Sequence, residues 1–117
     1  MKVPVSDLKA GAHVKGTTIA ELGNGNRPLD MIVYNKDGKD YLLLTNNMRG
    51  VMKIPTEGAG SAESITNPVT GGGTKGLGYD KITALKGVKE MDQLDNGHAL
   101  ILVDRNGTMD LETIELP

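Results

Sequence analysis

LDMIVYNKDGKDYLLLTNN, residues Leu29 to Asn47, contains two runs of β-forming residues separated by the turn-forming pair Asp37-Gly38. An Asp-Gly pair between two such runs is typical of a tight β-hairpin. A second pair of turn residues, Asn46-Asn47, leads into another β-forming run, Gly50–Pro55. This stretch therefore predicts three consecutive antiparallel strands joined by short turns.

Further β-forming runs lie on both sides of this stretch, and no window carries the apolar spacing of an amphipathic helix. The 16 glycines separate these runs from one another. Small residues dominate positions 58–78, which we interpret as a connector. The sequence thus predicts an all-β chain. The other expected strands are Thr17–Leu22, Lys81–Leu85, Val88–Leu94, His98–Val103 and Thr108–Leu116.

The composition excludes several classes of protein. The 117 residues include no Cys, Trp or Phe, so the core must be aliphatic, and disulfide frameworks and thiolate sites are excluded. The formal charge of −2, from 13 basic and 15 acidic residues, argues against a nucleic-acid partner. The longest apolar run, Ala99–Val103, is too short to span a bilayer, so no membrane insertion is expected.

The two halves of the chain share a pattern of strands and glycine turns, which is the mark of an internal repeat. The match is one of residue type more than of identity. It pairs Asp37-Gly38 with Asn96-Gly97, Tyr41–Leu44 with Ala99–Leu102, and Gly50–Met52 with Gly107–Met109. We therefore expect two similar units in the chain.

The first half resembles one blade of an NHL/YVTN-type β-propeller. Blades of this kind have a P-x-D lead-in, a DG turn, a YLLxTN-like second strand and a V-x-K-I third strand. The matching residues are Asn26–Met31, Asp37–Gly38, Tyr41–Asn47 and Val51–Ile54. The second half fits this pattern more loosely, since Gly87-Val88 replaces the proline lead-in.

The resemblance implies two four-stranded antiparallel blades, with a β-sandwich or barrel as the alternative fold. The expected parts of this single all-β unit are a first blade at about 17–57, a connector at about 58–78 and a second blade at about 79–117. Propellers close with about four to eight blades. The expected partners are therefore other copies of this chain or the rest of a larger propeller. The compartment stays open, with an extracytoplasmic location, periplasmic or secreted, favoured.

Six polar residues near the expected turns are candidates for ligand contact. Loops on a rigid scaffold concentrate binding residues, Arg offers a planar fork for anions, and Asn offers both a donor and an acceptor. The same residue types also stabilise turns, so a purely structural role is the alternative. The six are Asn26, Arg27, Asp30, Asn46, Asn47 and Arg49.

A second cluster, at the last expected hairpin, has the oxygen ligands of a calcium loop but not its spacing. It comprises Asp104, Asn106, Asp110 and Glu112. Because Asn-Gly favours tight hairpin turns, we interpret Asn106-Gly107 as a turn and expect no tight metal site.

No catalytic residue is assigned, because no triad pattern of Ser, His and acidic residues is present, and no cofactor is expected. The leading hypothesis is a non-catalytic binding or scaffold module of β-propeller type. An alternative is the C-terminal fragment of a propeller enzyme, quinoprotein or lactonase-like, with its catalytic residues in other blades. A two-blade lectin is disfavoured, because the chain has only three Tyr and no Trp for stacking sugars.

Overall fold

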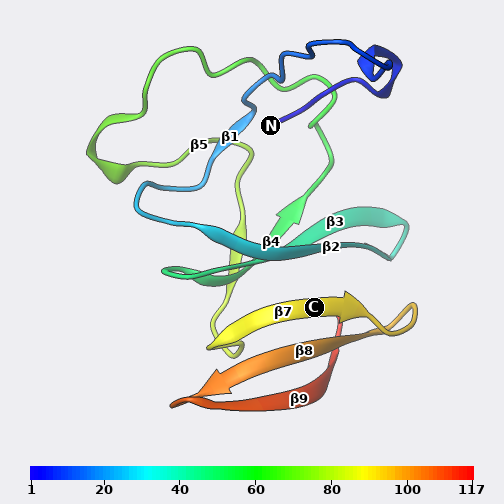
Figure 1. Ribbon diagram of the computed structural model, residues 1–117, viewed down its shortest axis with the longest axis vertical. Coiled ribbons are helices and arrows are strands. Elements are labelled where there is room, and N and C mark those ends of the chain that lie inside the picture. Colours follow the sequence, from blue (N-terminus) through cyan, green and yellow to red (C-terminus); the bar gives the residue numbers. More distant parts are fainter. The chain divides into compact units, whose positions relative to one another are not determined.

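The computed structural model describes residues 1–117 and confirms the all-β class, with 46% of residues in strands and 5% in helices. All sheets are antiparallel, and none closes into a barrel. The chain divides into two units (Figure 1). The larger unit comprises Gly25–Glu57 and Tyr79–Pro117, and the smaller comprises Met1–Asn24 and Gly58–Gly78.

The first sheet of the larger unit has four strands in the order β2-β3-β4-β6. The Asp37-Gly38 turn joins its first two strands, and both residues have positive φ, 54° and 75°, as expected for a two-residue hairpin. The strand bounds are Pro28–Lys36 for β2, Lys39–Asn46 for β3, Gly50–Pro55 for β4 and Asp80–Ile82 for β6.

The second sheet is a three-stranded meander of β7 (Val88–Gln93), β8 (His98–Arg105) and β9 (Thr108–Glu115). The last two strands meet at Asn106-Gly107, with φ of 56° and 91°, which confirms the predicted tight turn. The β7–β8 loop is longer. There the Asp95 side chain accepts hydrogen bonds from the N–H groups of Gly97 and His98, at 2.7 and 2.8 Å.

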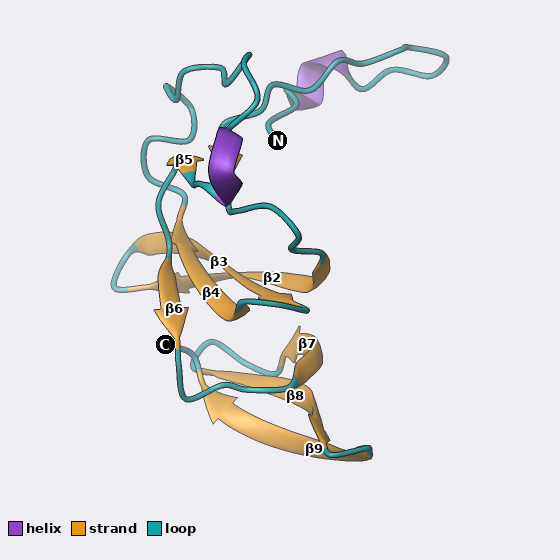
Figure 2. Cartoon of the chain, turned by 90° about the vertical axis from the view of Figure 1, so that its left-hand side faces the viewer, coloured by secondary structure: helices purple, strands orange, loops and turns teal.

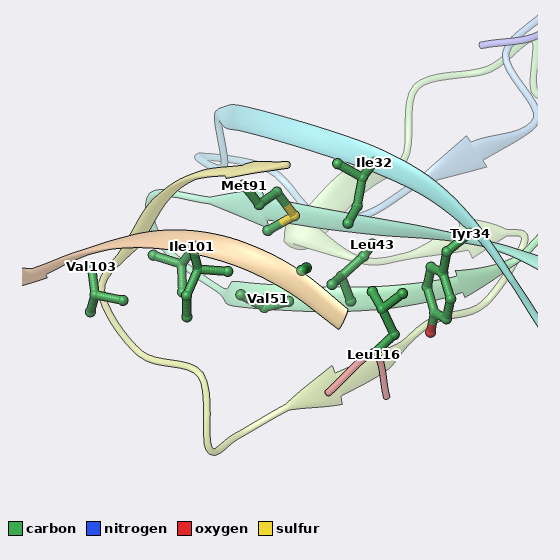
Figure 3. Packing of buried hydrophobic residues seen from close by; sticks show 10 residues of the cluster. Ile32, Tyr34, Leu43, Val51, Met91, Ile101, Val103 and Leu116 are labelled. Carbon is green, nitrogen blue, oxygen red and sulfur yellow. The ribbon is translucent and has the colours of Figure 1, made fainter. Parts of the chain in front are cut away.

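The two sheets of the larger unit pack face to face over one largely aliphatic core, and Figure 2 shows them as stacked layers. Alternate residues of each strand point into this core, as the period of a β-strand requires. A buried hydrogen bond from Thr45 Oγ1 to the Val88 carbonyl, 2.7 Å long, also joins the sheets. The buried cluster (Figure 3) comprises Ile32, Tyr34, Leu43, Val51, Val88, Met91, Ala99, Ile101, Val103 and Leu116.

The smaller unit has very little regular structure. Its one sheet pairs β1 (Ala20–Glu21) with β5 (Lys75–Gly76), and two short 3-10 turns, η1 (Val5–Asp7) and η2 (Thr70–Gly72), complete it. A Cβ atom at Gly76 would lie 2.1 Å from the Ile19 carbonyl oxygen, so only glycine fits at this position of β5.

Sheet membership differs from the expected two four-stranded blades. Strand β1, from the expected outer strand Thr17–Leu22, pairs with β5 from the expected connector. The fourth strand of the first sheet is instead β6, from the expected second blade, whose Ile82 lies opposite Val51. The second sheet therefore keeps three strands. A local pattern marks a strand but not its partner, and Ile82 gains apolar contacts by packing against the core cluster.

Candidate functional site

A groove of about 610 Å³ lies in the larger unit, between the β3–β4 turn and the segment that connects β6 to β7. Grooves of this size hold small-molecule ligands in many proteins. Its lining residues are Leu29, Asn46, Asn47, Met48, Arg49, Gly50, Lys81, Ile82, Thr83, Leu85, Lys86, Gly87, Val88 and Lys89.

The β3–β4 turn is built by Asn46, which ends β3, and by Asn47, which follows it. Asn46 Oδ1 accepts a hydrogen bond of 2.6 Å from the Arg49 N–H, which closes the turn on itself. Asn47 Oδ1 accepts a 2.7 Å bond from the Arg27 N–H, and the Asn47 N–H donates to the Arg27 carbonyl at 3.1 Å. Gly50 follows with φ of 76°. These contacts fix the backbone position from which the Arg49 side chain extends.

Two nitrogens in this turn have no hydrogen-bond partner although they are closed off from solvent: Asn46 Nδ2 and Arg49 Nε. Asn46 is only 3% exposed. Its amide cannot be reversed, because Oδ1 must face the Arg49 N–H, so the free atom is a donor. A buried donor without a partner costs about 1–3 kcal/mol. Such pairs of unused donors are rare in folded proteins.

The opposite wall is held close to the sheet core by backbone contacts. The Gly87 carbonyl accepts a 2.8 Å bond from the Asp104 N–H, and the Val88 carbonyl accepts the bond from Thr45. A Cβ at Gly87, where φ is 76°, would lie 2.5 Å from the Asp104 carbonyl oxygen. Only glycine allows this approach, which places Lys86 and Lys89 beside the groove.

The groove is basic, although the chain as a whole carries a formal charge of −2. Arg49, Lys81, Lys86 and Lys89 line it, and no Asp or Glu does. Among these four, only Lys89 forms an ion pair, at 3.5 Å from Asp104. The arrangement provides positive charge and unused donors, which is the chemistry that binds anions.

No model of a known protein family, no curated protein and no solved structure matches this chain.

Three of the six predicted contact residues, Asn46, Asn47 and Arg49, line the groove. The others do not. Arg27 engages the turn through its backbone. Asp30 instead joins two sheets, since its carboxylate accepts 2.8 Å bonds from the N–H groups of Met31 and Met91. Asn26 Oδ1 is buried without a partner outside the groove lining.

The sequence prediction missed the three lysines of the opposite wall. The segment Lys81–Lys89, KITALKGVK, contains three lysines and no acidic residue, which was the available signal. The sequence alone did not place these lysines at the site, because the turn at 46–50 and this segment are distant in sequence. They become neighbours only when β6 pairs with β4.

The four candidate metal ligands of the β8–β9 hairpin are engaged with other groups. Asp104 Oδ1 accepts a 2.8 Å bond from the Gly107 N–H, which lowers the pKa of Asp104, and Lys89 lowers it further. Arg105 contacts both Asp110, at 3.4 Å, and Glu112, and the bond to Glu112 raises the pKa of Arg105. Asn106 forms the turn itself.

His98 contacts Asp95, with Nδ1 3.0 Å from Oδ1. Hydrogen bonds from the Gly97 N–H and from His98 lower the pKa of Asp95. The chain contains no group of three His, Cys, Asp or Glu side chains placed to hold a metal ion. No helix has the length and apolar character that crossing a bilayer requires.

Proposed function

We propose that this chain is a non-catalytic β-propeller-type scaffold and binding module that assembles with further copies of itself. The observation that carries this proposal is an apolar patch on the face of the second sheet that points away from the shared core. We call it the outer patch, and it comprises Leu100, Leu102, Met109 and Leu111.

The register of the second sheet defines the outer patch. Leu102 lies opposite Leu111, while the intervening β8 residues Ile101 and Val103 point into the core. Leu111 is 69% exposed and Met109 is 47% exposed. Apolar residues on both faces are typical of a sheet that is covered on both sides.

The first sheet shows the same property along β2. Ile32 and Tyr34 point into the core, whereas Met31 and Val33 are exposed, the latter by 56%. An interface between two different faces of identical chains repeats from copy to copy and closes into a ring when the rotation allows. We therefore propose that a second copy of this chain covers the outer patch.

The strand order also supports this proposal. β2-β3-β4 and β7-β8-β9 are both antiparallel meanders, and their two sheets already stack within one chain. Strand β9 is hydrogen-bonded only to β8, so its other edge is open for pairing or for covering by a neighbour. About four to eight stacked sheets close a propeller ring.

Light scattering coupled to size-exclusion chromatography tests the assembly at micromolar concentrations. We expect the wild-type chain to elute as an oligomer and Leu111→Glu to elute as a monomer, because the substitution places a charge in the outer patch. Thr108→Glu is the matched control, since Thr108 is exposed on the same strand but on its other face, and it should remain oligomeric. A wild-type chain that is monomeric throughout this range refutes the proposal.

A further inference from the structure

We infer that the basic groove between the β3–β4 turn and residues 81–89 binds a small organic molecule that carries a dianionic phosphate group. This site lies on the first sheet and on the segment that follows it, and its argument does not depend on the proposed assembly. Three observations carry it: the charge of the lining, the unused donors, and the apolar residues beside them.

The charge of the lining selects the valence of the ligand. Arg49, Lys81 and Lys86 form no ion pair, and Lys89 is only partly compensated by Asp104. The lining therefore carries an excess of about three positive charges and no carboxylate. A dianion matches this excess better than a single carboxylate does, and Arg and Lys together are the residues that commonly bind phosphate.

The unused donors give the anion specific acceptor positions. Arg49 Nε and Asn46 Nδ2 belong to one turn, are closed off from bulk solvent and have no hydrogen-bond partner within the protein. A phosphate oxygen accepts from both after a small shift of the turn, whose Asn47 and Met48 are exposed. Binding then removes the cost of burying two unsatisfied donors, which a general electrostatic attraction alone does not do.

The apolar residues of the groove select the rest of the ligand. Leu29, Ile82, Leu85 and Val88 line it beside the cationic residues. With about 610 Å³ available, the groove exceeds what a single phosphate ion occupies. The geometry therefore favours a phosphate monoester with an apolar or aromatic body over inorganic phosphate.

Phenyl phosphate is the probe, titrated at constant ionic strength into ¹⁵N-labelled protein and followed by NMR. We expect saturable shifts confined to residues 46–50 and 81–89, together with a shift of the Arg49 Nε–H signal. Inorganic phosphate should bind more weakly, and phenol, which lacks the charge, should produce no saturable shift at the same sites. Phenol binding as tightly as phenyl phosphate, or shifts elsewhere only, would overturn the inference.

The lysine pair variant Lys81→Gln/Lys86→Gln removes two charges, and because both side chains are exposed it should leave the fold intact. We expect its affinity for phenyl phosphate to fall about tenfold or more, since charged hydrogen bonds are lost. The matched control, Lys9→Gln/Lys15→Gln, removes two exposed lysines of the smaller unit and should change the affinity by less than about twofold. Equal weakening by both pairs would mean non-specific attraction and overturn the inference.

Two further variants separate this site from the proposed assembly and from folding defects. Arg49→Gln should weaken binding at least as much as the lysine pair variant does. Circular dichroism checks that Arg49→Gln is folded, and if this variant does not fold, the lysine pair variant decides the test. Leu111→Glu should retain full affinity, because the outer patch lies on the other sheet. Binding that disappears in a folded Leu111→Glu variant contradicts the placement of the site.

Discussion

Tyr34 shows how one buried side chain couples the stability of this chain to pH. Its ring lies in the core cluster, stacked on Tyr41 with ring centroids 5.6 Å apart, and its hydroxyl donates to the Pro117 carbonyl. Burial raises the pKa of Tyr34 to about 12, and the neighbouring Tyr41 adds to the shift. The folded state therefore retains the phenol proton at a pH where the unfolded chain has lost it.

We predict that the free energy of unfolding decreases between pH 10 and pH 12. The raised pKa favours the protonated folded state, so the contribution is complete below pH 10 and is lost as pH rises. At pH 11 the loss is about 1.4 kcal/mol. Urea unfolding from pH 8 to pH 11 measures it, and Tyr34→Phe should remove this part of the slope. An unchanged slope in Tyr34→Phe would assign the pH dependence to other groups.

At the scale of elements, the two sheets are joined by polar contacts as well as by the core. Strand β2 lies near β7, and Asp30 connects them by accepting from the Met91 N–H across the gap. The register of β2 shifts between Pro28 and Asp30, and that of β7 shifts between Val88 and Glu90. Both strands are also at the edges of their sheets, so some of their N–H groups face away from the ladder, and the Asp30 carboxylate accepts from two of them.

We predict that Asp30→Ala destabilises the chain by about 1–3 kcal/mol, because the part-buried Met91 N–H loses its acceptor. Asp92→Ala is a close control. Asp92 makes the same local contact to the next residue's N–H, at 2.8 Å, but none to another strand. It should cost less than about 0.5 kcal/mol in urea unfolding. Equal losses in the two variants would show that the contact between sheets contributes nothing.

At the scale of the whole molecule, stability is distributed unevenly between the two units. The larger unit holds the core cluster and strands of up to nine residues. In the smaller unit, Ile19 is the one buried residue, and its two strands have two residues each. Regions with few buried apolar contacts open at low free energy.

We therefore predict that amide hydrogen exchange separates the units. The amides of β3 and β8 should exchange last, at a rate set by global unfolding, because both strands are central in their sheets. Amides of residues 1–16 should exchange within the first time points. Within this segment, the Lys2 amide donates to the Thr17 carbonyl at 2.7 Å and is the hydrogen-bonded amide with which the others are compared. Protection of residues 1–16 equal to that of β3 would contradict this division.

The local features of the larger unit were predictable from residue type. Asp37-Gly38 and Asn106-Gly107 form two-residue turns because these residues accept positive φ, and the runs of β-forming residues marked β2 and β8 as strands. Asn46, Asn47 and Arg49 were identified as site candidates because turn-forming amides and an arginine stood together after a strand. Each of these signals depends only on neighbours in sequence.

The pairing of the strands and the formation of the groove could be recognised only in the folded chain. A strand pattern states that a segment is extended, but hydrogen-bonding edges are alike, so no local signal assigned β6 to β4 or β1 to β5. That β6 pairing brings the lysines of residues 81–89 beside the 46–50 turn, which closes the basic groove. Residues close in sequence thus specified the turns and strands. The site instead arises from long-range strand pairing, because burial of Ile82 and Val88 against the shared core decides which strand edges pair.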